Sequence, residues 1–591
     1  PQQRLGMGVG PSVDCDVVPH ASAARLLRAA GAKGARVQSK PFRFIDLKRD
    51  PPDPALSRTS DLDKYCTHLF LPWRREAGRL VVACVEPTPI HLAHIRAAYR
   101  EPVVFAAAEQ GALLDAVESQ YRERLTHEAV YGLAEAEPEL CANRTVTKGQ
   151  AQTFACLTIA GLIAILLWPR FALATLAGFL AAAYLANILF RTVLVWLGAA
   201  EIFDAPPPPA PVADEDLPLY TILVPLYREA NVLPALTRSL RGLDYPPDLL
   251  DIKLVVEADD AETRAALNDL NLDPCFRTIV VPPSTPRTKP KACNYALRFA
   301  HGEFIVIFDA EDRPEPDQLK KAVARFRAAP DTVGCLQARL NFYNRDENWL
   351  TRLFALDYAL WFDFLLPGLD ALAVPMPLGG TSNHFRTSVL RAIHGWDSFN
   401  VTEDADLGIR LARLGHRATT LDSTTYEEAT SRSGDWLKQR SRWLKGYMQT
   451  WLVHMRNPRA LWKHAGPRGF FAFQLFIGGT FVSSLANPLM WAIFLASHAA
   501  GIAIFSGPFG EILARASLFS LVAGNALFVY LAMLGPYRRG WLQLTPYGIT
   551  APFYWLLISA AAYRAVWHLI RRPFHWEKTR HGISTFASPP G

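Results

Sequence analysis

Three carboxylates follow an apolar run near the middle of the chain. Residues 304–308 are all apolar, and Asp309, Glu311 and Asp312 come directly after them. Acidic side chains this close together repel one another unless a cation lies between them, and their hard oxygen ligands suit Mg²⁺ or Mn²⁺. Such an ion can bridge a diphosphate and neutralise it as it departs. A solvated acidic turn is the alternative, and this segment alone does not decide between the two.

A second acidic motif, Thr402-Glu403-Asp404, stands before a helical pattern at residues 405–414. A carboxylate such as that of Asp404 can remove the proton from a hydroxyl within hydrogen-bond reach. Thr402 followed by two acids is also a good helix N-terminus. We expect both properties, because a capped helix would hold the carboxylate in a fixed direction.

The third motif lies in a helical stretch. Gln439, Arg442 and Trp443 share one face at i, i+3 and i+4 spacing, and Arg440 lies next to Gln439. Arginine pairs with diphosphate oxygens through parallel hydrogen bonds, and an indole ring can form the floor of a sugar site. A tryptophan here can instead anchor the helix at a membrane surface.

The segments around these motifs predict an α/β domain. Short apolar runs alternate with helical patterns, which is typical of βαβ units and a largely parallel sheet. The expected strands are residues 219–226, 253–256, 278–281 and 304–308, and the expected helices are residues 233–243, 291–300 and 318–327. Ligands bind beyond the carboxyl ends of such strands, which is where Glu257, Asp259 and Asp309 fall.

The order of these motifs resembles that of the family 2 glycosyltransferases, particularly the processive, cellulose-synthase-like members. The resemblance covers residues 219–447. It implies a GT-A, Rossmann-like domain in the cytosol, inserted between transmembrane helices, that takes a nucleotide diphosphate sugar as donor. It further implies Mg²⁺ or Mn²⁺ as cofactor and an inverting reaction, in which an α-linked donor gives a β-linked product.

The same resemblance implies roles for single residues. Asp404 is the general base, within the catalytic motif of Thr402 and Glu403. The donor-binding residues are Glu257 and Asp259 beside the base, Lys289 and Lys291 beside the phosphates, and Gln439, Arg440 and Arg442. The acceptor-binding residues are Trp443, Gly380, Thr381 and His384. Asp309 is the first metal ligand, and either Glu311 or Asp312 completes the site. The family's usual Asp-Asp pair is altered at Glu257 and Asp259, so which of them contacts the base stays open.

Long uncharged stretches predict membrane spans on both sides of this domain. Residues 154–168 and 171–197 form a hairpin, and residues 470–505, 516–534 and 549–570 follow the catalytic domain. The run at 470–505 is longer than one crossing, so it holds either two short spans or an interfacial helix and one span. Two spans are favoured, which gives six in total, although Arg538 and Arg539 would then lie outside. The net charge of +7 comes without a long basic run, so a nucleic-acid partner is not expected.

We therefore divide the chain into six parts. These are an N-terminal cytosolic α/β regulatory or docking domain (1–150), a transmembrane hairpin (151–200), a Pro-rich linker (201–217), the catalytic domain (218–455), an interfacial helix with about four transmembrane helices (456–570), and a cytosolic tail or gating segment (571–591). The N-terminal domain resembles that of type II secretion ATPases, some of whose relatives bind cyclic di-GMP. Only Arg4-Leu5-Gly6 matches the repeat expected for such binding, so docking of a regulatory protein is favoured.

Three functions remain open at this stage, and the third is a non-enzymatic receptor or secretion component, which the N-terminal domain suggests. The first is a processive polymerase in the bacterial inner membrane that extends a β-linked polysaccharide from UDP-glucose and moves it across the bilayer. The second is a non-processive transferase that acts on a polyprenyl phosphate or another lipid acceptor. The segment at 575–582 resembles the loop that covers the donor in processive synthases, and a basic tail beside the membrane is the alternative.

Overall fold

The computed structural model describes residues 42–85, 92–93, 95–96, 99, 101–203, 207, 209–499, 507–578, 582 and 584. Several expectations fall outside this range. They are the Arg4-Leu5-Gly6 segment, Pro206 and Pro208 of the expected linker, and residues 579–581 of the expected gating segment.

The N-terminal domain is built on a four-stranded sheet with the order β1-β4-β3-β2. Its strands are β1 (Phe44–Ile45), β2 (Phe70–Glu76), β3 (Arg79–Cys84) and β4 (Val103–Ala108), and its helices include α2 (Leu62–His68) and α4 (Gln110–Ala136). β3 pairs with β2 antiparallel and with β4 parallel. Tyr65, Leu71, Val82 and Leu113 are fully buried in its core. The small α/β domain expected from the sequence is therefore present.

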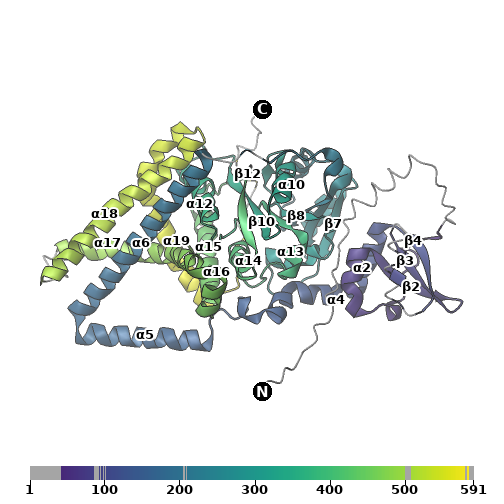
Figure 1. Cartoon of the computed structure of the whole chain (residues 1–591), viewed down its shortest axis with the longest axis horizontal. Helices are drawn as coiled ribbons and strands as arrows, with labels where there is room; N and C mark the ends of the chain where they lie inside the picture. Colours follow the sequence, from purple (N-terminus) through teal and green to yellow (C-terminus); the bar gives the residue numbers. More distant parts are fainter. Residues whose placement is uncertain are drawn as a thin grey trace, which may run out of the picture. The chain divides into compact units, whose positions relative to one another are not determined.

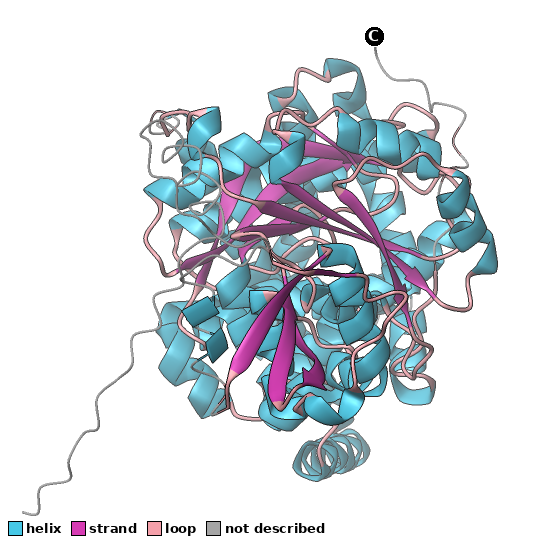
Figure 2. Ribbon diagram, turned by 90° about the vertical axis from the view of Figure 1, so that its right-hand side faces the viewer, coloured by secondary structure: helices cyan, strands magenta, loops and turns pink. Residues whose placement is uncertain are grey.

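An eight-stranded mixed sheet forms the core of the next domain and carries helices on both faces (Figure 2). Its order is β7-β6-β5-β8-β11-β10-β12-β9. The strands are β5 (Tyr220–Leu226), β6 (Leu250–Glu257), β7 (Phe276–Val281), β8 (Phe304–Ile307), β9 (Arg313–Pro314), β10 (Val333–Phe342), β11 (Asn383–Arg386) and β12 (Arg417–Glu427). β5, β6, β7 and β8 are parallel, as expected. β11 runs antiparallel to both β8 and β10, so the sheet is mixed rather than largely parallel.

Helices connect these strands, and those at Leu233–Arg241, Lys289–Leu297, Gln318–Ala328 and Glu403–Arg413 lie close to the helices expected at residues 233–243, 291–300, 318–327 and 405–414. They are α7 (Leu233–Arg241), α8 (Ala261–Asp269), α9 (Lys289–Leu297), α10 (Gln318–Ala328), α11 (Trp349–Leu360), α12 (Leu366–Ala371), α13 (Thr387–Ala392), α14 (Glu403–Arg413) and α15 (Ser433–His454). α9, α14 and α15 begin or run beside the ends of the strands, and they carry the lysine, carboxylate and arginine side chains singled out above.

Five helical segments in the described part of the chain are long and apolar enough to cross a membrane. They are Lys148–Leu167, Pro169–Ala200, Pro458–Ala496, Ala514–Arg538 and Leu542–Arg571. The helices involved are α5 (Lys148–Leu167), α6 (Pro169–Phe203), α16 (Pro458–Phe473), α17 (Gly479–Ala499), α18 (Gly507–Arg538) and α19 (Ala551–Arg571). The expectation of six spans is corrected. α16 continues through a π-helical turn at Gln474–Gly478 into α17, and Pro488 lies inside α17, so the described residues of this region form one candidate span instead of two.

The long helix α6 joins the domain of the eight-stranded sheet to the other apolar helices. It runs beside α18 (Figure 1) and crosses α12. A Cβ atom added at Gly198 would lie 2.1 Å from Phe364 O, and one added at Gly368 would lie 2.2 Å from Leu194 O. The two backbones therefore touch at this crossing, which only glycine permits at these two positions.

Candidate active site

One cavity of about 900 Å³ collects most of the residues singled out in the sequence. The predicted site residues that line it are Glu257, Lys289, Asp309, Glu311, Gly380, Thr381, Thr402, Glu403, Asp404, Gln439, Arg440, Arg442 and Trp443. Four others do not line it, namely Asp259, Lys291, Asp312 and His384. Motifs more than 130 positions apart in the chain therefore meet in one space.

Lys289 stands at the first position of α9 and reaches into the cavity. Its Nζ lies 2.5 Å from Asp309 Oδ1 and donates a hydrogen bond of 2.6 Å to Gly380 O. Burial alone would lower the pKa of Lys289, but Asp309, Asp404 and Glu403 outweigh it and hold that pKa well above its usual value. The ammonium group is therefore charged. It lies among the carboxylates of Asp309, Glu403 and Asp404, which by themselves would repel a diphosphate.

The two acids at the end of β6 differ in their surroundings. Glu257 lines the cavity and accepts a hydrogen bond of 2.7 Å from Lys291 Nζ, which is completely buried. Burial raises the pKa of Glu257, and Lys291 offsets part of that effect. Asp259 does not line the cavity, but it lies 2.5 Å from Arg287, which does. Lys291 therefore holds Glu257 in place instead of reaching the cavity, which corrects its expected place beside the phosphates.

The acidic turn after β8 presents two of its three carboxylates. Asp309 and Glu311 line the cavity. Asp312 is buried. It accepts one hydrogen bond of 2.7 Å from Asp309 N and another from the Thr381 hydroxyl. Burial, with the nearby Asp309 and Glu311 charges, raises the pKa of Asp312 well above its usual value. Its role is to shape the turn, because its carboxylate faces the protein and not the cavity.

The acidic turn offers a divalent cation only part of a metal site. Within the described ranges, no three His, Cys, Asp or Glu side chains converge as a ready-made metal site. Asp309 and Glu311 nevertheless offer two carboxylates to the cavity, and Mg²⁺ is commonly held by one or two carboxylates together with substrate phosphates. Burial and the charges of Asp312, Glu311 and Asp309 also raise the pKa of Glu427, which lines the same cavity. This crowding of acids is the environment that a cation relieves.

Asp404 lies in the first turn of α14 and, like Lys289, lines the cavity. Burial, with the neighbouring Glu403 charge, raises the pKa of Asp404 well above its usual value, and Lys289 partly offsets this. Thr402 occupies the N-cap position, but its hydroxyl makes no capping hydrogen bond. It lies instead 3.4 Å from Arg442 O on α15. The expected side-chain cap is therefore corrected, because the Thr402 hydroxyl faces the neighbouring helix.

A glycine on α15 allows this approach. A Cβ atom added at Gly446 would lie 2.1 Å from the Thr402 hydroxyl oxygen and 2.8 Å from Thr402 N. Because one of these atoms belongs to the backbone, a side chain at Gly446 would push the start of α14 away from α15. The position of Asp404 in the cavity therefore depends on Gly446.

The loop before β11 lines the cavity together with the carboxylates of Asp309 and Asp404. Gln337 accepts a hydrogen bond of 2.7 Å from Gly379 N and donates one of 3.1 Å to Thr381 O, so it fixes the loop that exposes Gly380. His384 lies further along, in β11, with its Nδ1 2.7 Å from the Tyr220 hydroxyl. Burial lowers the pKa of His384 to about 3. Its expected place in the acceptor site is corrected, since this neutral, fully buried ring belongs to the core under the sheet.

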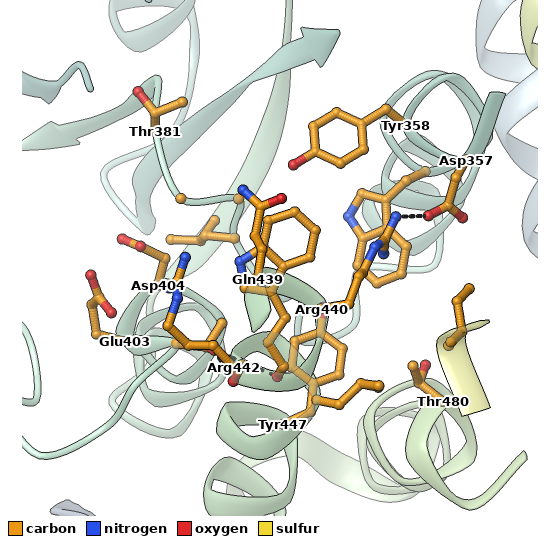
Figure 3. A pocket seen from close by; sticks show the side chains of 18 of the residues that line it. Asp357, Tyr358, Thr381, Glu403, Asp404, Gln439, Arg440, Arg442, Tyr447 and Thr480 are labelled. Atoms are coloured by element: carbon orange, nitrogen blue, oxygen red, sulfur yellow. Dashed lines mark hydrogen bonds and ion pairs between the residues drawn. The ribbon is translucent and has the colours of Figure 1, made fainter. Parts of the chain in front are cut away.

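The helix α15 presents its two arginines to different parts of the cavity. Arg442 lies near Glu403 and Asp404, whereas Arg440 points toward Asp357 on α11 (Figure 3). Arg440 donates hydrogen bonds to Asp357 and to the Tyr554 hydroxyl, the latter of 2.7 Å. Its guanidinium carbon also lies 4.9 Å from the centre of the Trp443 ring. The expectation that Arg440 contacts the donor is therefore corrected, because the side chain is engaged beside Trp443.

The C-terminal segment covers part of the same cavity. Phe574, His575, Trp576 and Lys578 line it. The Arg442 guanidinium carbon lies 5.3 Å from the Trp576 ring centre, and Lys578 Nζ lies 2.9 Å from Glu229 Oε1. Of the two interpretations of this segment, a cover over the donor side agrees with these contacts.

Sequence reasoning missed the part of the wall that comes from the apolar helices. Tyr184, Asn187 and Arg191 of α6 and Thr480, Ser483, Ser484 and Asn487 of α17 line the same cavity. A signal was present, because Arg191 is the one charged residue in the run at 171–197. The cavity therefore continues from the catalytic domain into the space between candidate membrane spans.

Two family models match the chain. Residues 304–563 match the model described as glycosyl transferase family group 2, and residues 40–127 match the MshEN domain. The first match begins at β8 and runs through the acidic turn, α14, α15 and the apolar helices to α19.

Curated relatives and a solved structure are also similar to part of the chain. The probable glycosyltransferase YdaM of Bacillus subtilis (strain 168) is 25% identical over 240 residues, which are 39% of this chain and 56% of that protein. The beta-monoglucosyldiacylglycerol synthase of Trichormus variabilis is 27% identical over 251 residues, which are 41% of this chain and 52% of that protein. The chain thus spans about half the length of these relatives. The solved mannosyltransferase PcManGT of Pyrobaculum calidifontis, in complex with GDP-Man and Mn²⁺, is 24% identical with a TM-score of 0.44, over 66% of this chain and 99% of that one.

Asp309, Asp404 and the Gln439 to Trp443 motif all fall within the first matched range. Residues 304–563 of the chain are thus similar to the family group 2 glycosyl transferases, and the segment that precedes them, residues 40–127, is similar to the MshEN domain.

Proposed function

We propose that this protein is an inverting hexosyltransferase that extends a β-linked polysaccharide and passes it between its own membrane helices. The observation that carries the proposal is the continuity of the cavity. One space of about 900 Å³ joins Asp309 and Asp404 to Trp443 and then to the polar side chains of α6 and α17. An acceptor long enough to reach from Asp404 past Trp443 has room in it, and a glycan chain is such an acceptor.

The donor would lie between the end of β6 and the acidic turn. Glu257 and Asp259 are the candidates for contact with the base of the nucleotide. We propose UDP-glucose as the donor, so that this base is uracil. Lys289 and Arg442 would pair with the diphosphate oxygens. Asp309 and Glu311 would hold Mg²⁺ or Mn²⁺, which supplies charge neutralisation for the departing diphosphate.

Asp404 would act as the general base. The acceptor hydroxyl oxygen forms a bond to the anomeric carbon while the bond from that carbon to the diphosphate oxygen breaks. The hydroxyl proton passes to the Asp404 carboxylate, and the electron pair of the broken bond leaves with the nucleotide diphosphate. Attack from the side opposite the leaving group inverts the anomeric centre, so an α-linked donor gives a β-linked product.

We also propose a topology of four crossings with the catalytic domain in the cytosol of a bacterial cell. α19 contacts the catalytic domain at both of its ends. Near its start Thr550 accepts a hydrogen bond of 2.9 Å from Trp349 Nε1, and just after its end Arg572 O lies 3.2 Å from Lys445 Nζ. A helix held to one domain at both ends does not reach the far side of a bilayer, so α19 would lie along the membrane surface. Arg538 and Arg539 then stay on the catalytic side, where Arg539 pairs with Asp363 at 2.5 Å.

The N-terminal domain would regulate the catalytic one. Its helix α4 reaches the segment before the Thr402-Glu403-Asp404 motif, where the Ser398 hydroxyl donates a hydrogen bond of 2.5 Å to Val130 O. Tyr131 of the same helix lines the cavity. Docking of a regulatory protein, or binding of cyclic di-GMP, could therefore act on the site through α4.

A second candidate function is transfer to a single lipid acceptor. The relative named beta-monoglucosyldiacylglycerol synthase favours it, because that name describes a lipid product. A lipid acceptor would receive one sugar or a few, whereas a polymerase makes long chains.

Product length separates the two functions. The full chain in nanodiscs would be incubated with a panel of nucleotide sugars and Mg²⁺ or Mn²⁺, and nucleotide diphosphate release and product size would be measured. We expect diphosphate release with UDP-glucose and a product of many β-linked units. Release accompanied only by a singly glycosylated lipid would replace the proposal by the second candidate, and no release with any donor would reject both.

A further inference from the structure

Arg191 carries a charge into one of the candidate membrane spans and lies on the wall of the cavity. It belongs to α6, nine residues before the end of the span Pro169–Ala200, which corresponds to about 14 Å along the helix axis. Charged side chains at such depth are costly and mark substrate or ion pathways. The cavity-facing position of Arg191 agrees with this use.

Protein contacts hold the guanidinium group in place but do not use it completely. Its Nε donates a hydrogen bond of 3.1 Å to Asn187 Oδ1, and its Nη2 donates one of 2.8 Å to Thr480 Oγ1. The rings of Phe476 and Phe528 lie 5.4 and 5.9 Å from its guanidinium carbon. Among the described residues, nothing accepts a hydrogen bond from Nη1. The group is therefore preorganised, with one nitrogen left for a ligand.

The positive charge of Arg191 has no acidic partner. No carboxylate of the described residues lies within ion-pair distance of it. Asp357 is close enough to act on it electrostatically, but that carboxylate is already paired with Arg440. Thr480, on the neighbouring helix, lines the same cavity as Tyr447 (Figure 3). An anion that entered the cavity here would meet a fixed, uncompensated guanidinium group.

The cavity wall beyond Arg191 is polar, so it suits a sugar chain better than a hydrocarbon chain. Ser483, Ser484 and Asn487 follow Thr480 along α17 and line the cavity over about two further turns. Asn487 Oδ1 is buried without a hydrogen-bond partner. The Ser484 hydroxyl already donates a hydrogen bond of 2.7 Å to Thr480 O. An acyl chain in this space would leave the Asn487 amide oxygen unpaired at a cost in free energy, whereas a sugar hydroxyl would donate a hydrogen bond to it. The lining therefore favours a glycan beyond Arg191.

From these observations we infer that Arg191 binds an anionic oxygen group on the glycan that occupies the cavity, so that the polysaccharide is acidic through hexuronic acid units, which a nucleotide diphosphate hexuronic acid supplies as a second donor besides UDP-glucose. A guanidinium group forms charge-assisted hydrogen bonds with carboxylate and phosphate oxygens, and Nη1 is the nitrogen of Arg191 left to donate one. This inference rests on the proposed function, since it requires a glycan between the helices. It adds the chemical class of that glycan.

Binding of short oligosaccharides tests the inference directly. The full chain in nanodiscs of zwitterionic phospholipid would be titrated with a hexuronic acid oligosaccharide and with a neutral glucose oligosaccharide of equal length, and tryptophan fluorescence would report binding. We expect the wild type to bind the acidic one at least about tenfold more tightly, because hydrogen bonds to charged groups are the stronger ones. Arg191→Gln should remove this preference, and Arg191→Lys should retain part of it. Arg170→Gln, at the exposed start of the same helix, should behave as the wild type.

Two results would overturn the inference. Equal affinity of the wild type for both oligosaccharides is one, and a preference that survives in Arg191→Gln is the other. Polyprenyl phosphate would be tested as a third ligand. If it bound more tightly than the acidic oligosaccharide, and if this binding required Arg191, the ligand of Arg191 would be a lipid phosphate and not a glycan. If Arg191→Gln did not fold, shown by loss of UDP binding, the wild-type comparison and Arg191→Lys would still decide.

Nucleotide diphosphate release in the same preparations separates this inference from the proposed function. Absence of release with every donor would reject the proposed function. Release and polymer formation without a preference for acidic oligosaccharides would reject only the inference about Arg191.

Discussion

Lys289 Nζ lies 2.5 Å from Asp309 Oδ1, so the side chain placed to meet the donor phosphates is paired with the first carboxylate of the acidic turn. The pair brings together the start of α9 and the end of β8. A diphosphate with a cation would offer Lys289 new anionic partners and Asp309 a new positive one, so both groups can exchange partners without leaving a charge unpaired.

Replacement of Lys289 should therefore weaken donor binding. In Lys289→Gln we expect the KM for the nucleotide sugar to rise about tenfold or more, because a charge-assisted contact to phosphate is lost. Lys320→Gln is a suitable control, since Lys320 pairs with Asp214 and Asp244 far from the cavity lining. An unchanged KM in Lys289→Gln would remove this residue from the donor site.

Gly446 should be required for the position of Asp404. In Gly446→Ala the new methyl group would meet Thr402 N at 2.8 Å, so the start of α14 must move. We expect kcat to fall at least about tenfold while UDP affinity, measured by calorimetry, changes little, because small misplacements of a catalytic group are costly. Gly434→Ala lies in the same helix with no atom within 4 Å of the added Cβ and should retain activity. Equal behaviour of the two variants would contradict this account of the α14–α15 contact.

Arg440 should affect the acceptor rather than the donor. Asp357→Asn removes the ionic partner of Arg440, which lies 4.9 Å from the Trp443 ring. We expect a shorter product and a higher KM for an oligosaccharide acceptor, with the KM for the nucleotide sugar unchanged. Arg440→Lys, which keeps the charge but not the planar group, should show the same division. A rise confined to the donor KM would instead restore Arg440 to the donor site.

The pH dependence of transfer should report the neighbours of Asp404. Burial and Glu403 raise the pKa of Asp404, so its carboxylate becomes protonated, and unable to accept a proton, at a higher pH than an ordinary aspartate. Transfer should therefore fall on acidification through that raised pKa. Glu403→Gln removes a nearby negative charge, which lowers the pKa of Asp404 and should move the acid limb of the kcat profile to lower pH. An acid limb that stays in place, or moves to higher pH, would contradict the assignment.

The sequence predicts the parallel half of the sheet well, because β5 and β8 are almost entirely apolar and the second half of β6 carries the apolar run Leu254-Val255-Val256. It does not predict β11, whose four residues mix polar and apolar side chains and depend on pairing with β8 and β10. The same limit applies to His384 and Lys291. Residue type and motif order suggest polar roles in the site, but burial by distant strands directs these side chains into the protein.

The resemblance to the family 2 glycosyltransferases implies roles for Asp309, Asp404 and Trp443 in one reaction, and the structure places all three on the wall of one cavity. The contribution of α6 and α17 depends on how helices 290 positions apart pack together, and no local pattern reports that. Arg191 was visible as a charge within an apolar run, yet its partner Thr480 could only be found from the fold.

Sugar transfer by an Asp404→Asn variant is the most direct test of the account. The full chain in nanodiscs would be supplied with UDP-glucose, Mn²⁺ and acceptor, with Asp331→Asn, an exposed carboxylate, as control. We expect the variant to bind UDP as the wild type does and to transfer about 10²–10⁴-fold more slowly, while Asp331→Asn keeps full activity. Transfer at the wild-type rate by Asp404→Asn would contradict the account.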